Sequence, residues 1–323
     1  MKTNVSSALP RDEREVLREA FLEREGFAGV PLSPLPADCS KRRYFRLPSM
    51  LLMDAPPSHE STVSFQVMAD FLRDAGLTVP CIYASDHENG FLLVEDLGEL
   101  TFRKAIERGL SETMLYGEVI QSLIHLHQKV TDNTITLSSF NLNLFLSGTE
   151  VYLDWYGLPL SPQAKEDFQG LWRDAYHQQP KMPHSIVMRD VMVDNLMWLP
   201  SRTGFQRCGF IDFQDGVWGP ISYDLVSHLQ DGRRDISPQF AKDMVELYLK
   251  AFPELNAQDF WTSYALWGAQ LSTRLLGLFH RLAKRDGKPQ YTVHLPRVKA
   301  TLEHNLSHPS LRPIRGWFQS VGL

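Results

Sequence analysis

The chain has 323 residues, of which 43% are hydrophobic and 22% are charged, and its formal net charge is −5. This is the composition of an ordinary soluble globular protein with one large or two medium domains, and the negative charge argues against nucleic-acid binding as its main activity. The N-terminus has no apolar signal core and no apolar run could span a bilayer, so we expect a cytoplasmic protein. The three cysteines have no paired spacing, which predicts free thiols rather than disulfides or a zinc site.

The first third of the sequence predicts a small lobe built around a β-sheet. Residues 11–25 carry apolar residues at helical spacing and end at Gly26, so we expect a helix on the outside of this lobe. Residues 31–36 are too rich in proline for a helix. Apolar patterns then predict two strands, a helix and two buried strands, at residues 42–47, 50–53, 65–72, 79–83 and 91–94.

The first predicted hairpin lies where a kinase-type fold covers the phosphates of its nucleotide. The loop before it has small residues but no glycine, so backbone donors at Ser40 and Lys41 would have to bind the phosphates. The lysine that kinases carry on the third strand is absent, and we expect an arginine of the hairpin to replace it. Strand alternation places Arg42 and Arg46 on one face and Arg43 on the other. Each of them is either a phosphate ligand or a solvated charge on an edge strand.

A strand that ends in Glu95-Asp96-Leu97-Gly98 is typical of the segment that joins the two lobes of a kinase-type fold. Such a segment binds adenine through backbone groups, so Glu95 and Leu97 are the predicted contacts; the alternative is a plain strand-to-helix turn. We place the boundary here, with a nucleotide-covering lobe at 1–96 and a catalytic, acceptor-binding lobe at 97–323. The second lobe is mainly helical, with segments predicted at 111–127, 171–176, 237–252 and 257–285.

One stretch of the second lobe carries the chemistry. Asp190 is followed by Asn195, and Asp212 ends a predicted strand. Strand-like residues on both sides of a polar turn at 200–204 predict a hairpin that returns Asp212 to Asn195. Asp190 would accept the proton of a substrate hydroxyl, while Asn195 and Asp212 offer the hard oxygen ligands that Mg²⁺ prefers. Each residue alone is a common turn residue, but the combination predicts a phosphoryl-transfer site.

The motifs Met188-Arg189-Asp190-x4-Asn195, Ile211-Asp212-Phe213 and Tyr223-Asp224 resemble those of the aminoglycoside phosphotransferase and choline kinase superfamily. The chain is most similar to the bacterial anomeric N-acetylmuramate/N-acetylglucosamine kinases, from about residue 35 to 320. This resemblance implies an α+β, bilobal protein-kinase-like fold with a small antiparallel-sheet N-lobe and a larger, mainly helical C-lobe. Met188 is a departure, because the superfamily usually has histidine there.

The resemblance also implies an activity. The reaction would be ATP- and Mg-dependent phosphorylation of the C1 hydroxyl of N-acetylmuramate or N-acetylglucosamine, with a product that feeds cell-wall recycling. Asp215, Gln270 and Arg274 are the acceptor-binding candidates that it implies. We expect a small-molecule acceptor, and no nucleic acid, membrane or obligatory protein partner.

Charge helps to separate the possible acceptors. From residue 260 to the end there are nine lysines and arginines and only two acidic residues. A basic wall disfavours a polycationic aminoglycoside and suits a sugar with a lactyl carboxylate, for which Arg274 is the candidate partner. Aminoglycoside, choline or homoserine kinases remain alternatives. A nucleotide-binding pseudokinase with a regulatory role is a further alternative. The absent lysine, the absent glycines and Met188 are the features that motivate it.

Overall fold

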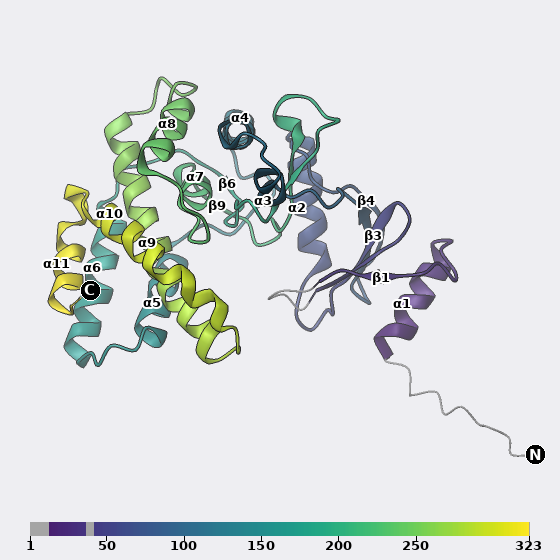
Figure 1. The fold of residues 1–323 in the computed structure, drawn as a ribbon, viewed down its shortest axis with the longest axis horizontal. Coiled ribbons are helices and arrows are strands. Elements are labelled where there is room, and N and C mark those ends of the chain that lie inside the picture. Colours follow the sequence, from purple (N-terminus) through teal and green to yellow (C-terminus); the bar gives the residue numbers. More distant parts are fainter. Residues whose placement is uncertain (1–12, 37–41, 323) are drawn as a thin grey trace, which may run out of the picture. The chain divides into compact units, whose positions relative to one another are not determined.

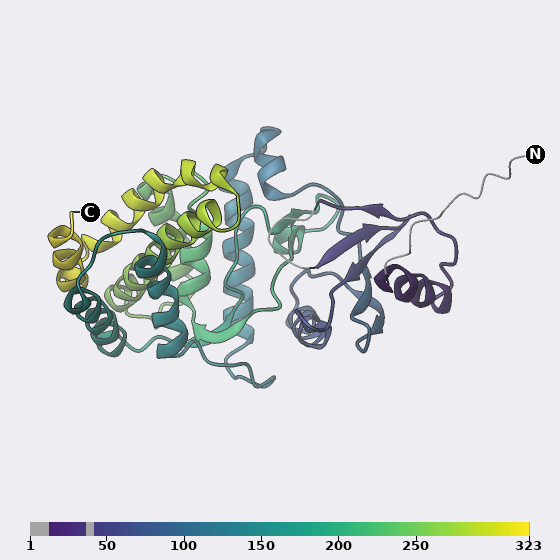
Figure 2. The same cartoon turned by 90° about the horizontal axis from the view of Figure 1, so that it is seen from below.

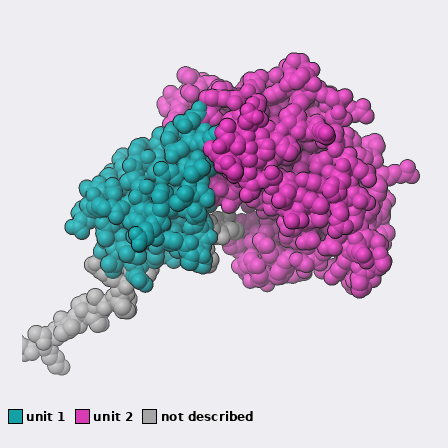
Figure 3. Space-filling model, turned by 180° about the vertical axis from the view of Figure 1, so that it is seen from behind, with its two compact units in different colours: residues 1–74, 78–99 teal, residues 75–77, 100–323 magenta. Residues whose placement is uncertain are grey.

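The computed structural model describes residues 13–36 and 42–322. The chain divides into two compact units, residues 1–74 with 78–99 and residues 75–77 with 100–323 (Figure 3). The first unit holds a five-stranded antiparallel sheet and the second is mainly helical (Figure 1). The predicted α+β, protein-kinase-like fold class is therefore confirmed.

The first unit is built on one sheet whose strands follow the order β1-β2-β3-β5-β4, each antiparallel to its neighbour. Its elements are α1 (Glu13–Arg24), β1 (Ser33–Pro34), β2 (Arg43–Arg46), β3 (Met50–Asp54), α2 (Thr62–Asp74), β4 (Ile82–Asp86) and β5 (Phe91–Glu95). Two details correct the sequence prediction. The proline-rich linker contributes the short edge strand β1, and β4 is a half-exposed edge strand rather than a buried one. An edge strand has a partner on only one side, and Tyr83 on β4 is exposed.

Helix α1 packs on this sheet, as the periodicity of residues 11–25 predicts (Figure 2). Phe21 of the helix stacks on Phe91 of β5, with ring centroids 5.6 Å apart. Polar groups join the same elements, because the buried carboxylate of Asp54 accepts hydrogen bonds from Arg14 and, at 3.1 Å, from Arg18. A buried carboxylate needs such partners to offset the loss of its hydration. The pairs therefore fix α1 to the end of β3.

Substitution Asp54→Ala should lower the free energy of unfolding by about 2–4 kcal/mol, because both arginines would lose their acceptor. Urea denaturation of the full chain measures this loss. The matched control is Asp70→Ala, which breaks the exposed Asp70–Arg73 pair on α2 and should change stability by no more than about 0.5 kcal/mol. Equal effects of the two substitutions would contradict the structural role of Asp54.

The second unit combines nine helices with two short two-stranded sheets, counted over its described residues. The helices are α3 (Phe102–Glu107), α4 (Glu112–Lys129), α5 (Leu142–Trp155), α6 (Pro162–Gln178), α7 (Ser222–Leu229), α8 (Pro238–Leu249), α9 (Ala257–Lys284), α10 (Leu295–Leu306) and α11 (Arg312–Ser320). The strands are β6 (His184–Val187), β7 (Leu196–Trp198), β8 (Cys208–Phe210) and β9 (Val217–Pro220). Three short 3-10 turns lie at Gly204–Arg207, Pro289–His294 and Pro309–Leu311.

Local sequence signals explain several helix starts. Ser111 and Ser237 cap α4 and α8 with side-chain oxygens that accept backbone N–H groups, and Pro238 occupies the first turn of α8. The predicted helix at 171–176 is longer than expected, because Ser161 caps α6 ten residues earlier. No helix in the described part of the chain combines the length and apolarity required to cross a membrane.

Helices α5 and α9 pack closely against each other (Figure 1). A Cβ atom on Gly277 would lie 2.2 Å from the carbonyl oxygen of Val151, so only glycine permits this approach. One turn of α5 earlier, a Cβ atom on Gly148 would meet the amide nitrogen of Gln270 at 2.2 Å. The two glycines thus set the spacing between the helices, and with it the width of the pocket described below.

Candidate active site

The predicted hairpin exists and orders the candidate metal ligands. β7 and β8 pair with Leu196 opposite Phe210, and the N–H of Ile211 donates to the carbonyl of Asn195 at 3.0 Å. This bond brings Asp212 next to Asn195, as the sequence analysis predicts. The second strand is shorter than expected, because Gly204–Arg207 form a 3-10 turn before it.

Asp190 lies in the loop of residues 188–195 between β6 and β7, which we call the Asp190 loop. Its main-chain carbonyl accepts the N–H of Met192 at 2.9 Å and the side-chain Nδ2 of Asn195 at 3.0 Å. Burial raises the pKa of the Asp190 carboxyl above its ordinary value; nearby Arg274 opposes the shift and Asp212 adds to it. A half-desolvated carboxylate of raised pKa is a stronger base than an exposed one, as proton abstraction requires.

Helix α7 holds the start of this loop. The buried carboxylate of Asp224 accepts the N–H of Met188 at 2.7 Å and that of Arg189 at 2.9 Å, and the hydroxyl of Ser227 donates to the Arg189 carbonyl at 2.9 Å. Arg189 has φ of +75°, a left-handed conformation that side chains rarely adopt. These three bonds stabilise the conformation that directs Asp190. Sequence reasoning noted Asp224 only as part of a motif and missed Ser227.

Met188 is buried just after β6, at the position where the resemblance noted in the sequence analysis implies a histidine. Its loop is held through its backbone N–H rather than through its side chain. The backbone of the Asp190 loop is therefore held in place even without a histidine at position 188.

Asn195 and Asp212 suit a magnesium ion chemically. Because Asn195 Nδ2 donates to the Asp190 carbonyl, the amide is oriented and its Oδ1 has no hydrogen bond within the described residues. Asp212, with φ of +65°, supplies the carboxylate, and one of its oxygens accepts from Gln214 Nε2 at 3.0 Å. No group of three or more His, Cys, Asp or Glu residues in the described chain forms a closed metal site. One amide oxygen and one carboxylate would offer Mg²⁺ the hard oxygen ligands that it prefers.

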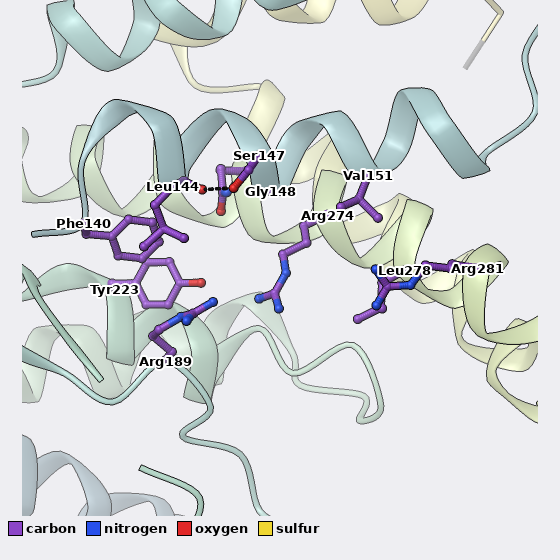
Figure 4. Close-up of a pocket in the computed structure, with 11 residues that line it drawn as sticks. Phe140, Leu144, Ser147, Gly148, Val151, Arg189, Tyr223, Arg274, Leu278 and Arg281 are labelled. Carbon is purple, nitrogen blue, oxygen red and sulfur yellow. Dashed lines mark hydrogen bonds between the residues drawn. The ribbon is translucent and has the colours of Figure 1, made fainter. Parts of the chain in front are cut away.

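A pocket of about 200 Å³ lies between α5, α7, α9 and the Asp190 loop. Figure 4 shows Arg274 reaching into it, with Arg189 and Tyr223 on one side and Arg281 on the other. Apolar side chains complete the wall, namely Phe140, Leu144, Val151 and Leu278. We call this cavity, with Arg189, Arg274 and Arg281 in its wall, the arginine pocket.

The acceptor candidates from the sequence have different positions. Gln270 and Arg274 line the arginine pocket, and the Nε2 of Gln270 donates to the Phe145 carbonyl at 2.9 Å. The Oε1 of Gln270 is buried and has no partner among the described residues. Asp215 is exposed and is not part of the pocket wall. Arg189 and Arg281 were missed, although Arg281 is seven residues after Arg274 and so on the same face of a helix.

The candidate nucleotide contacts belong to the first unit. Arg42 forms an ion pair with Glu60 at 2.6 Å and its side chain is 9% exposed. Arg46 binds Asp96 at 2.6 Å and also Glu99, whereas Arg43 is exposed.

The end of β5 and the segment after it contain Glu95 and Leu97, the two residues whose backbone groups are predicted to bind adenine. The N–H of Glu95 donates to the Cys81 carbonyl at 2.8 Å, while the N–H of Leu97 makes no hydrogen bond within the described chain. Leu97 is therefore the better placed of the two to donate to a ligand. Ser40 and Lys41 lie outside the described residues.

Substitution Arg274→Gln should move the acid limb of the pH profile of kcat/KM to higher pH. Arg274 lowers the pKa of Asp190, so its removal lets burial raise that pKa further. The limb reports the base of the free enzyme and is measured by initial rates across pH. Arg281→Gln is the control, since Arg281 is not among the groups that shift Asp190. A limb that stays in place, or moves to lower pH, would contradict this coupling.

The fold and this site define the chain as a protein of the kinase-like class. Over 95% of its length, its structure resembles that of a choline/ethanolamine kinase family protein from Mesorhizobium loti (99% of that chain, TM-score 0.65, 14% identity). It also resembles the ADP-bound aminoglycoside phosphotransferase APH(2'')-Ib over 90% of its length (98% of that chain, TM-score 0.61, 13% identity). At these identities the likeness concerns the fold.

Sequence comparison narrows the class. Residues 31–259 match the model of the phosphotransferase enzyme family, and the chain belongs to that family. It is 30% identical to an N-acetylmuramate/N-acetylglucosamine kinase of Caulobacter vibrioides, over 95% of this chain and 96% of the relative. A kinase of the same name from Neisseria meningitidis is 32% identical over 81% of each chain. The protein is thus a phosphotransferase.

Proposed function

We propose that this phosphotransferase uses Mg-ATP to phosphorylate the anomeric (C1) hydroxyl of N-acetylmuramate, N-acetylglucosamine or both. The observation that carries the proposal is the half-buried Asp190, whose neighbour Arg189 lines a pocket of about 200 Å³ with two further arginines. This volume is below the roughly 300–1,000 Å³ of pockets for drug-sized ligands, and it suits one sugar ring better than a multi-ring aminoglycoside. The names of the relatives support the same class of acceptor.

In the proposed reaction Asp190 accepts the proton of the C1 hydroxyl as its oxygen forms a bond to the γ-phosphorus, and ADP leaves. An anomeric hydroxyl is more acidic than an ordinary alcohol, so one carboxylate is a sufficient base. Mg²⁺, when bound, would neutralise charge on the phosphates, and Asn195 and Asp212 would hold it. The buried Oε1 of Gln270 would accept a hydrogen bond from a hydroxyl or acetamide N–H of the sugar.

In the first unit we assign Arg42 as the cation that replaces the strand lysine. Its ion pair with Glu60, just before α2, resembles the lysine–glutamate pair that kinases use to position the phosphates. Arg46 is already engaged by Asp96 and Glu99. The N–H of Leu97 would bind the adenine ring.

We propose that the sugar 1-phosphate re-enters cell-wall synthesis in the cytoplasm. The test is ADP release from Mg-ATP with N-acetylmuramate, N-acetylglucosamine, kanamycin, choline, homoserine or no acceptor. Turnover on the amino sugars, with the phosphate located on C1 by NMR, is the expected result. Turnover only on kanamycin, choline or homoserine would show that the proposed acceptor is wrong. ATP binding without turnover on any acceptor would favour the pseudokinase.

A further inference from the structure

The arginine pocket holds three guanidinium groups that make almost no hydrogen bonds or ion pairs within the described residues. Several other arginines of the second unit pair with acidic residues, namely in Arg103–Asp194, Arg207–Glu118, Arg234–Glu112, Arg285–Asp286 and Arg297–Asp235. The side chains of Arg274 and Arg281 have no ion pair or hydrogen bond within the described residues. The guanidinium group of Arg189 makes only a long bond within the described residues, of 3.4 Å, from its NH1 to the Asp215 carbonyl. No Asp or Glu lines this cavity.

Two of these guanidinium groups have donors that are shielded from water. The Nε atoms of Arg189 and Arg281 are buried and have no acceptor in the described chain. A buried donor without a partner is unfavourable, by about 1–3 kcal/mol or more for a charged group. A carboxylate is the ligand that best removes this penalty, because its two oxygens match the planar fork of a guanidinium.

The positions of the arginines along α9 suggest a division of roles. Arg274 lies on the side of the pocket nearer to Arg189, the neighbour of Asp190 in the chain (Figure 4), and we therefore place it near the reacting hydroxyl. Arg281 follows two turns later on the same face, about 10 Å along the axis at 1.5 Å per residue. Leu278 and Val151 provide apolar surface between them, which suits methyl groups of the acceptor. An acceptor that spans this distance would need an anionic group at the end away from its reacting hydroxyl.

We propose that Arg281 binds a carboxylate at the end of the acceptor away from its reacting hydroxyl, and that this contact makes the enzyme prefer an acidic amino sugar to its neutral counterpart. The inference rests on the proposed function and adds Arg281 as a residue that determines specificity. Between the two sugars considered above, N-acetylmuramate carries the carboxylate and N-acetylglucosamine does not, so the first is the preferred acceptor.

The experiment compares kcat and KM for both sugars in the wild type, Arg281→Gln and Arg281→Lys. Arg281→Gln should lower kcat/KM for N-acetylmuramate by about 10- to 100-fold, the usual worth of a hydrogen bond to a charged group, and that for N-acetylglucosamine by less than about threefold. The loss should appear mainly in KM, because the carboxylate is bound equally in the ground and transition states. Arg281→Lys should restore part of it.

Two controls separate recognition from folding. Arg285→Gln removes an exposed cation that is paired with the adjacent Asp286 and should change neither sugar's kinetics. The carboxamide of N-acetylmuramate should react with the wild type about as slowly as N-acetylmuramate reacts with Arg281→Gln, and it should be insensitive to that substitution. Thermal unfolding confirms that each variant is folded.

The outcomes are distinct. An equal loss on both sugars, or no loss on N-acetylmuramate, overturns the role of Arg281 while the proposed function stands. A wild type that prefers N-acetylglucosamine overturns the stated preference. If the wild type phosphorylates neither sugar, the proposed function fails, and this inference fails with it.

Discussion

Substitution Asp190→Asn should reduce kcat by about 10²–10⁴-fold on the acceptor of the wild type, the range typical of losing a general base. Asparagine keeps the size of the side chain but cannot take the proton of the hydroxyl. The loop itself should survive, because its internal bonds to Met192 and Asn195 use the main-chain carbonyl of residue 190. The measurement is ADP release at saturating ATP and acceptor.

Stability distinguishes this effect from misfolding. Burial raises the pKa of Asp190, so its charged form is unfavourable in the native state and a neutral amide should not lower the free energy of unfolding. The control Asp167→Asn, at an exposed position of α6, should leave both kcat and stability unchanged. If Asp190→Asn retained kcat within threefold, the assignment of Asp190 as the base would be wrong.

Substitution Asp224→Ala should be damaging in a different way. It removes the acceptor of two N–H groups, those of Met188 and Arg189, which would be left unpaired inside the protein. We expect a loss of about 2–4 kcal/mol in the free energy of unfolding and a fall in kcat of about 100-fold or more, because a misplaced Asp190 loop no longer aligns the base. Denaturant unfolding and ADP release measure the two effects, and a variant with normal kcat would show that Asp224 does not position the loop.

Asp224 also predicts a pH dependence of stability. Burial raises its pKa to about 7, against the opposing effect of the two N–H donors, whereas in the unfolded chain it is about 3.9. The native state therefore binds this proton more tightly than the unfolded chain does. The contribution of protonated Asp224 to the free energy of unfolding is full below about pH 4 and is lost as the pH rises through 7. Asp224→Asn cannot titrate and should flatten the change in denaturation midpoint between pH 4 and 7. An unchanged slope would contradict the raised pKa.

The hydrogen bonds that hold the Asp190 loop show whether the enzyme needs a histidine in place of Met188. In the sequence, the missing histidine, lysine and glycines are consistent with a pseudokinase. In the structure, Asp224 and Ser227 hold the backbone on both sides of Arg189 without that histidine. Arg42 has an acidic partner in Glu60, as the absent lysine would. These contacts favour an active enzyme, and the turnover experiment decides.

The sequence by itself determined the parts of this protein whose signals are local. Asp190, Asn195 and Asp212 fall within 23 residues that form one loop and the hairpin after it, so spacing and turn chemistry sufficed to bring them together. Serine caps and apolar periodicity predicted α4, α8 and α9, because a helix depends on neighbours three and four residues away.

Only the tertiary structure decided how distant side chains are matched. Arg46 binds Asp96, fifty residues away, while Arg42 binds Glu60, and strand alternation had placed both arginines on one face. The helix α5, which forms one wall of the arginine pocket, was not predicted, and neither was the place of Arg281 in that pocket. Whether an arginine is neutralised or left open to a ligand depends on which acids the fold brings within about 4 Å of it, and no pattern along the chain carries that information.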